Sequence, residues 1–119
     1  MKLLEAKKVS YSKKIDGQEY FQVMFEGERE GKRDYVLIQR VFERPTDGMI
    51  YFECKEIEDC GHYVIKKAKL WRDRMAIKLP GLGGARWEIR FEIEEEKYKE
   101  LAENLRVILS NPNRMEKET

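Results

Sequence analysis

The sequence is poor in several residue types, and each scarcity excludes a class of protein. Only two cysteines are present, Cys54 and Cys60, too few for a disulfide framework. No apolar run approaches the length of a membrane span. The start, MKLLEAKK, returns to charged residues too soon for a secretory signal. We therefore expect a cytosolic protein with free thiols and no membrane partner.

Uncharged polar side chains are also scarce, because glutamine and asparagine occur only three times each. Charged residues make up 39% of the chain, against roughly 25% in an ordinary domain. A chain rich in lysine and glutamate and poor in amides is typical of proteins from hot environments, so we expect a thermophilic source. The 24 Lys and Arg residues balance 23 Asp and Glu residues, and the resulting net charge of +1 predicts no nucleic-acid partner.

The last third of the chain carries the clearest structural pattern. Apolar residues first alternate with charged ones, as in a strand, and then recur at helical spacing. The helix is expected to begin after the glutamates at 94–96 and to end near Ser110, before Pro112. The two apolar faces need each other, so we expect one buried cluster of Trp87, Ile89, Phe91, Leu101, Leu105 and Ile108.

Seven strand-like runs follow one another along the chain. They cover residues 3–11, 19–26, 33–42, 49–57, 62–71, 74–79 and 86–93. Turn signals separate them, most clearly at Asp16-Gly17, Gly27–Gly31 and Pro45-Thr46-Asp47-Gly48. Short links join neighbours, so we predict an α+β fold: an antiparallel meander sheet of six or seven strands with one C-terminal helix packed on one face. Residues 1–112 form a single domain, and 113–119 a polar C-terminal tail.

One strand carries more apolar surface than a single helix covers. In YVLIQRVF (Tyr35 to Phe42) both faces of the strand are largely apolar. A meander with one helix leaves one of these faces to solvent, unless the sheet curls strongly or another chain covers it. Curvature and a partner explain the pattern equally well.

No catalytic or metal-binding constellation stands out. Cys54, Cys60 and His62 are the only collection of soft ligands, whereas a structural zinc site needs four. Gly81-Leu82-Gly83-Gly84 leads into a strand, but a phosphate loop opens a helix. The glutamates between residues 92 and 96 face outward or lie in a solvated first turn, where no pocket tunes an acid and base pair. We expect no enzyme, no metal and no cofactor.

Charge is segregated locally even though the total balances. The segment 66–78 is basic, with Lys66, Lys67, Lys69, Arg72, Arg74 and Lys78. The preceding strand end is acidic, with Glu53, Glu56, Glu58 and Asp59. A basic hairpin can hold phosphates, yet this one lacks the aromatic ladder of single-strand binders. We interpret it as a solvated face that pairs in part with the acidic strand beside it.

Three segments taken together carry a resemblance. They are YVLIQRVFE (Tyr35 to Glu43), GHYVIKKAKLWRDRMAIKL (Gly61 to Leu79) and WEIRFEIEEEKYKELAENLRVIL (Trp87 to Leu109). In order and spacing they resemble the immunity protein 10 family of bacterial polymorphic toxin systems. The resemblance covers residues 35 to 110 and implies a stoichiometric inhibitor that binds and blocks a toxin, with no catalysis of its own.

Two function classes therefore compete. The first is a binding protein that occupies a toxin domain, and its partner-binding surface is expected at Glu56, Glu58, Asp59, His62 and Tyr63. The second is a self-associating structural or interaction module, a homodimer in which a second copy covers the excess apolar face.

Overall fold

The computed structural model describes residues 2–14, 20–41, 49–81, 84–109 and 115–117. The first strands are β1 (Lys2–Lys14), β2 (Tyr20–Arg29), β3 (Lys32–Val41), β4 (Ile50–Cys54) and β5 (Gly61–Tyr63), with a single 3-10 turn, η1 (Ile57–Asp59), before β5. They are followed by β6 (Lys67–Leu70), β7 (Arg74–Lys78), β8 (Arg86–Phe91), the helix α1 (Glu95–Ile108) and β9 (Met115–Lys117). The α+β class and the C-terminal helix are confirmed.

All described strands belong to one sheet, in the order β5-β4-β3-β2-β1-β8-β7-β6-β9. The pairing is mostly antiparallel, but β1 pairs with β8 and β6 with β9 in parallel. The predicted count of six or seven strands is wrong, since nine are described. The single meander is also wrong: β1 to β5 form one meander, β6 to β8 form another, and the parallel pair of β1 and β8 joins them.

Two segments account for the larger number of strands. The run predicted as one strand over 62–71 is divided between β5, which pairs with β4, and β6, which pairs with β7. The chain crosses from one meander to the other between them, where Ile65 is buried. The segment predicted as a polar tail contains β9, which extends the second meander beyond β6.

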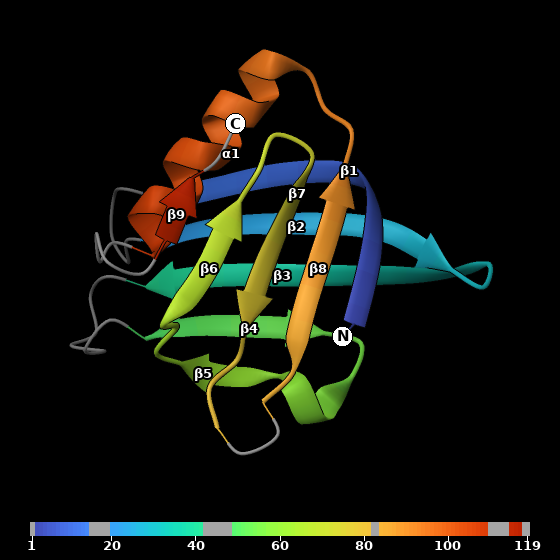
Figure 1. Cartoon of the computed structure of the whole chain (residues 1–119), viewed down its shortest axis with the longest axis vertical. Coiled ribbons are helices and arrows are strands. Elements are labelled where there is room, and N and C mark those ends of the chain that lie inside the picture. The colour runs from blue at the N-terminus through green and yellow to red at the C-terminus, as the bar shows by residue number, and fades with distance from the viewer. Residues whose placement is uncertain (1, 15–19, 42–48, 82–83, 110–114, 118–119) are drawn as a thin grey trace.

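β1 is long and bends so that it serves both meanders. Its residues from Ala6 onward pair with β2, whereas Lys2–Ala6 pair with β8, and the register shifts between Ala6 and Lys8. The bend requires a close approach, since a Cβ on Gly27 of β2 would lie 2.1 Å from the carbonyl oxygen of Glu5. The two meanders therefore cross at a steep angle and face each other across the core (Figure 1).

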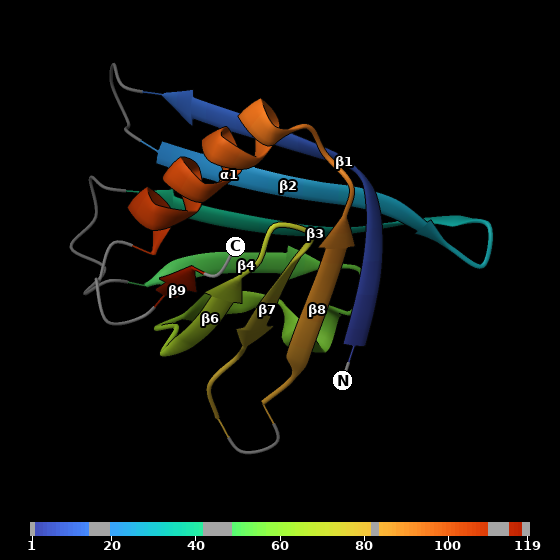
Figure 2. The same cartoon turned by 45° about the horizontal axis from the view of Figure 1, so that its top comes forward.

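The core fills the space between the two meanders and α1. Phe25 stacks on Phe91 with ring centroids 6.1 Å apart, and Phe52 meets Trp87 at 6.0 Å, so each contact joins one meander to the other. Figure 2 shows α1 lying over β1 and β2. The predicted cluster is confirmed, because its members are all buried: Trp87, Ile89, Phe91, Leu101, Leu105 and Ile108. Within the described residues no helix has the length and apolarity needed to cross a membrane.

The turn predictions have different outcomes. Asp16-Gly17 and the turn at residues 45–48 lie outside the described residues. The loop predicted over Gly27–Gly31 is shorter, because β2 continues to Arg29 and only Glu30 and Gly31 form the turn. Both have positive φ, at 54° and 76°, as a two-residue hairpin turn of type I′ requires.

Candidate functional site

The acidic turn, defined as Glu56, Glu58 and Asp59, points largely inward. Asp59 is only 8% exposed. Its Oδ2 accepts a hydrogen bond from the indole Nε1 of Trp87 at 3.2 Å and from Nζ of Lys2 at 2.5 Å. Lys2 also binds Glu56, whose other oxygen lies 3.9 Å from Nη1 of Arg29. Two of the three expected partner-binding carboxylates therefore hold the N-terminal strand against η1.

Lys2 is the cation at the centre of this network. Its hydrogen bonds to Asp59 and then to Glu56 raise the pKa of the Lys2 amine above its ordinary value. The amine also lies 5.9 Å from the centroid of the Trp87 ring. A charge-assisted network of this kind fixes one arrangement of the three segments that meet here.

Of the remaining residues expected in the partner-binding surface, one is half-buried and two are exposed. Tyr63 is half-buried and donates its hydroxyl to the backbone carbonyl of Asp59 at 2.8 Å. Glu58 and His62 are exposed, and the His62 ring lies 5.2 Å from that of Tyr51. Ile57, which the sequence did not single out, is 84% exposed at the tip of η1. The accessible residues of the predicted site are therefore Glu58 and His62, and the exposed Ile57 is the chain neighbour of Glu58.

The two thiols lie beside the acidic turn. Cys54 Sγ donates to the carbonyl of Glu56 at 3.3 Å, and Cys60 Sγ donates to the carbonyl of Cys54 at 3.3 Å. Burial raises the pKa of the Cys54 thiol to about 12, so it is protonated at neutral pH. The described part of the chain contains no group of three or more His, Cys, Asp or Glu residues that could hold a metal ion.

The outer face of the first meander carries a set of amphipathic side chains that α1 does not cover. We call it the tyrosine face and define it as Met24, Tyr35, Leu37, Gln39, Tyr51, Glu53 and His62. Met24 is opposite Leu37, and Leu37 is opposite Glu53. The alternation of Val36 and Ile38, both fully buried, with Tyr35 and Leu37 places the latter pair outside.

Glu53 organises the polar groups of the tyrosine face. It accepts hydrogen bonds from the hydroxyls of Tyr51 at 2.6 Å and Tyr35 at 2.8 Å. These two bonds lower the pKa of Glu53. Burial, followed by the bond to Glu53, raises the pKa of Tyr35 to about 12. The bond to Glu53, followed by burial, raises that of Tyr51 to about 12. Hydrogen bonds to Glu53 therefore fix the two tyrosine rings, and no element of the described ranges lies over them.

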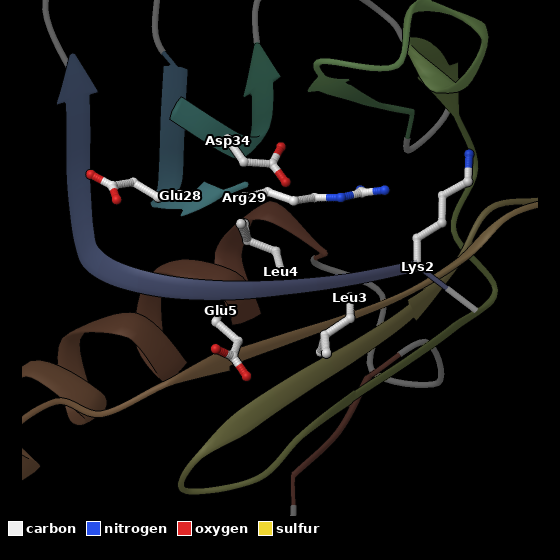
Figure 3. Close-up of a pocket in the computed structure, with 7 residues that line it drawn as sticks. All are labelled: Lys2, Leu3, Leu4, Glu5, Glu28, Arg29 and Asp34. Carbon is white, nitrogen blue, oxygen red and sulfur yellow. The ribbon is translucent and has the colours of Figure 1, made fainter. Parts of the chain in front are cut away.

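A pocket of about 440 Å³ opens where β1 separates from the end of β2. Figure 3 shows its lining, with Leu4 and Glu5 on opposite sides of β1. Asp34, 5% exposed, accepts the backbone N–H of Tyr35 through Oδ1 at 2.9 Å. Its Oδ2 is buried and has no hydrogen-bond partner among the described residues. The sequence contained one sign of this burial: Asp34 has the same alternation as Val36 and Ile38, which places it on the buried face of β3.

The glutamates between residues 92 and 96 and the glycine-rich segment 81–84 were both weighed as candidate sites from the sequence. Glu92, Glu94, Glu95 and Glu96 are all exposed. Gly84 leads into β8, while residues 82–83 of the glycine-rich segment lie outside the described part. Neither feature is brought to the pocket or to the acidic turn.

Comparison with known proteins adds no relative. No family model matches the chain, and neither a curated protein nor a solved structure matches it.

Proposed function

We propose that this protein is a non-catalytic inhibitor that binds a cognate bacterial toxin, as its resemblance to the immunity protein 10 family implies. The observation that carries the proposal is the tyrosine face, a sheet surface of half-buried aromatic, methionine and leucine side chains that no described helix or strand covers. Such residues are enriched where proteins bind each other, and tyrosine is frequent among the residues that contribute most.

Hydrogen bonds already hold the polar side chains of the tyrosine face in one arrangement. Glu53 holds Tyr35 and Tyr51, and the amide of Gln39 donates to Gln22 at 3.1 Å. Side chains that are already fixed lose little conformational freedom when a partner docks. The exposed residues of η1, Ile57 and Glu58, follow β4 and add an apolar and an acidic contact beside this face.

The second candidate is self-association through the same face. Leu37 and Met24 form a cross-strand apolar pair on the outer side of β2 and β3. A second copy that packs there would bury this pair in a two-fold interface. Sedimentation of the purified protein separates the two candidates: the inhibitor is monomeric until its toxin is added, whereas the module is already a dimer.

The inhibitor is tested by co-expression with the toxin gene next to its own. Growth should be rescued, and the two proteins should purify as a stoichiometric complex. Leu37→Arg should abolish rescue by placing a charge at the centre of the face. Leu3→Arg makes the same change on β1, outside this face, where Leu3 is 40% exposed, and it should rescue fully.

Glu58→Lys tests the acidic turn separately. Glu58 is exposed, so its reversal leaves the fold intact, whereas reversal of Asp59 would place a cation beside Lys2 and Trp87. Slower association that depends on salt places Glu58 at the rim of the interface. Absence of rescue and of any complex with the wild-type protein would rule out the inhibitor.

A further inference from the structure

Three cations lie in one line across adjacent strands of the second meander. Lys67 of β6 is opposite Lys78 of β7, and Lys78 is opposite Arg86 of β8. We call these residues the basic row. All three are exposed, while their chain neighbours Ala68, Ile77 and Trp87 are buried in the core. The basic row therefore lies on the outer face of this meander, behind which Figure 1 shows the first meander.

The basic row is unfavourable for folding. Adjacent strands lie about 4.8 Å apart, so the backbone positions of these three cationic residues span only about 10 Å. Like charges directly opposite each other destabilise a sheet. None of the three makes an ion pair within the described part of the chain.

Two other arginines on this face, Arg74 and Arg90, do have an acidic partner. Arg74 is opposite Arg90, but Glu88 lies between them, 3.9 Å from Arg74 and 2.8 Å from Arg90. The acidic strand was expected to pair in part with the hairpin, but three of its four carboxylates have other partners. Glu56 and Asp59 bind Lys2, and Glu53 accepts hydrogen bonds from two tyrosines. Arg74 and Arg90 are thus neutralised on this face, whereas no described carboxylate forms an ion pair with the basic row.

We propose that the basic row binds the phosphate backbone of a nucleic-acid duplex. A duplex carries one negative charge about every 1.7 Å of its axis, which matches a dense line of cations. A folded protein seldom offers three adjacent carboxylates, for the same reason that adjacent cations destabilise this sheet. The proposal depends on strand register and is independent of the net charge of +1 and of the inhibitor function.

The outer face of the second meander, which carries the basic row, suits a nucleic-acid duplex better than a single strand. Binding of single strands uses exposed aromatic rings on which bases stack. Trp71 is the aromatic residue of the hairpin, and the guanidinium of Arg74 lies 4.4 Å from the centroid of its ring. Backbone contacts from lysine and arginine need no aromatic platform and carry no sequence information.

The test is fluorescence anisotropy with a short labelled DNA duplex, measured across a range of salt concentrations. Three phosphate contacts predict that the logarithm of the association constant falls against the logarithm of salt concentration with a slope of about −2.7. Lys78→Glu should weaken binding at low salt by at least about tenfold and should reduce the slope by about one. Lys99→Glu, the same change at an exposed position of α1, should leave affinity and slope close to wild type.

The central variant should remain folded. Lys78→Glu places a carboxylate between Lys67 and Arg86, so its melting temperature should be no lower than that of the wild type. A loss of duplex binding then reflects the surface and not unfolding. A melting temperature well below wild type would contradict the repulsion on which the proposal rests.

Three results would overturn the proposal. The first is no salt-dependent duplex binding by the wild-type protein at low salt. The second is equal weakening by Lys78→Glu and Lys99→Glu. The third is obtained by competition. If polyglutamate displaces the labelled duplex as well as unlabelled duplex does, at equal concentrations of negative charge, the partner of the basic row is an acidic protein.

Discussion

The indole N–H of Trp87 donates a hydrogen bond to Oδ2 of Asp59 across 3.2 Å. Trp87 belongs to β8 and Asp59 to η1, so this bond connects the second meander to the turn that follows β4. Lys2 binds the same carboxylate oxygen and brings β1 to the same point. Asp59 is therefore a structural residue with partners in both meanders.

Asp59→Ala should lower the free energy of unfolding by about 1–3 kcal/mol, because the buried indole N–H of Trp87 loses its acceptor. Denaturant unfolding measures the loss. The matched control is Glu58→Ala at an exposed position of the same turn, with an expected change within about 0.5 kcal/mol. Equal stabilities for the two variants would mean that the Asp59 network contributes little.

Leu105→Ala should lower the free energy of unfolding by about 2–5 kcal/mol, since it opens a cavity between α1 and the sheet. Leu105 is fully buried, whereas its neighbour Arg106 is exposed. Arg106→Ala is therefore the control and should have a small effect. A loss below about 1 kcal/mol for Leu105→Ala would show that α1 is not docked on the sheet.

Gly27→Ala should destabilise the protein by about 1–3 kcal/mol, the usual cost of overpacking. The new methyl group would lie 2.1 Å from the carbonyl oxygen of Glu5, so β1 and β2 would have to separate at the bend. Gly31→Asn is the comparison, because asparagine adopts positive φ more readily than other L-residues and a Cβ at this turn, where φ is 76°, meets no atom within 4 Å; it should destabilise less than Gly27→Ala. Thermal melting of both variants tests the assignment, and Gly27→Ala with wild-type stability would contradict it.

Stability should fall as pH rises from about 10 to about 12. Tyrosine in an unfolded chain ionises near pH ~10, whereas the pKa values of Tyr35 and Tyr51 are raised to about 12. Between these limits the unfolded chain releases protons that the folded chain retains, so alkali favours unfolding. Denaturant unfolding across this range should give a shallower pH dependence for the double variant Tyr35→Phe and Tyr51→Phe than for the wild type. Equal slopes would contradict the raised pKa values.

Local patterns predicted the elements well where burial alone decides the structure. The alternation from Arg86 to Phe91 and the helical spacing up to Ile108 gave β8 and α1 with their buried faces. The strand pairing was not accessible in this way. The pattern of residues 3–11 is the same whether the strand keeps one neighbour or changes neighbours at a bulge. The sequence therefore gave no sign that Lys2 pairs with Trp87 of β8.

The candidate site was predicted only in part, for a similar reason. A run of acidic residues at 56–59 indicated a surface patch because carboxylates are usually solvated. Whether one of them turns inward depends on a donor at that place, and the donor to Asp59 is Trp87, distant in the sequence. The tyrosine face was the apolar excess already visible in YVLIQRVF, but its polar organisation by Glu53 needed the register of β3 with β4.

The double pairing of β1 also sets an order on folding during synthesis. As the chain leaves the ribosome, the part of β1 from Ala6 onward meets β2 almost at once, but Lys2–Ala6 must wait for β8. Until then the first meander exposes the apolar side on which Phe52 and Phe25 later meet Trp87 and Phe91. Contacts between residues so far apart in the chain form slowly, so the first half of the nascent protein is vulnerable to aggregation until β8 pairs with Lys2–Ala6 and α1, which follows β8, packs on β1 and β2.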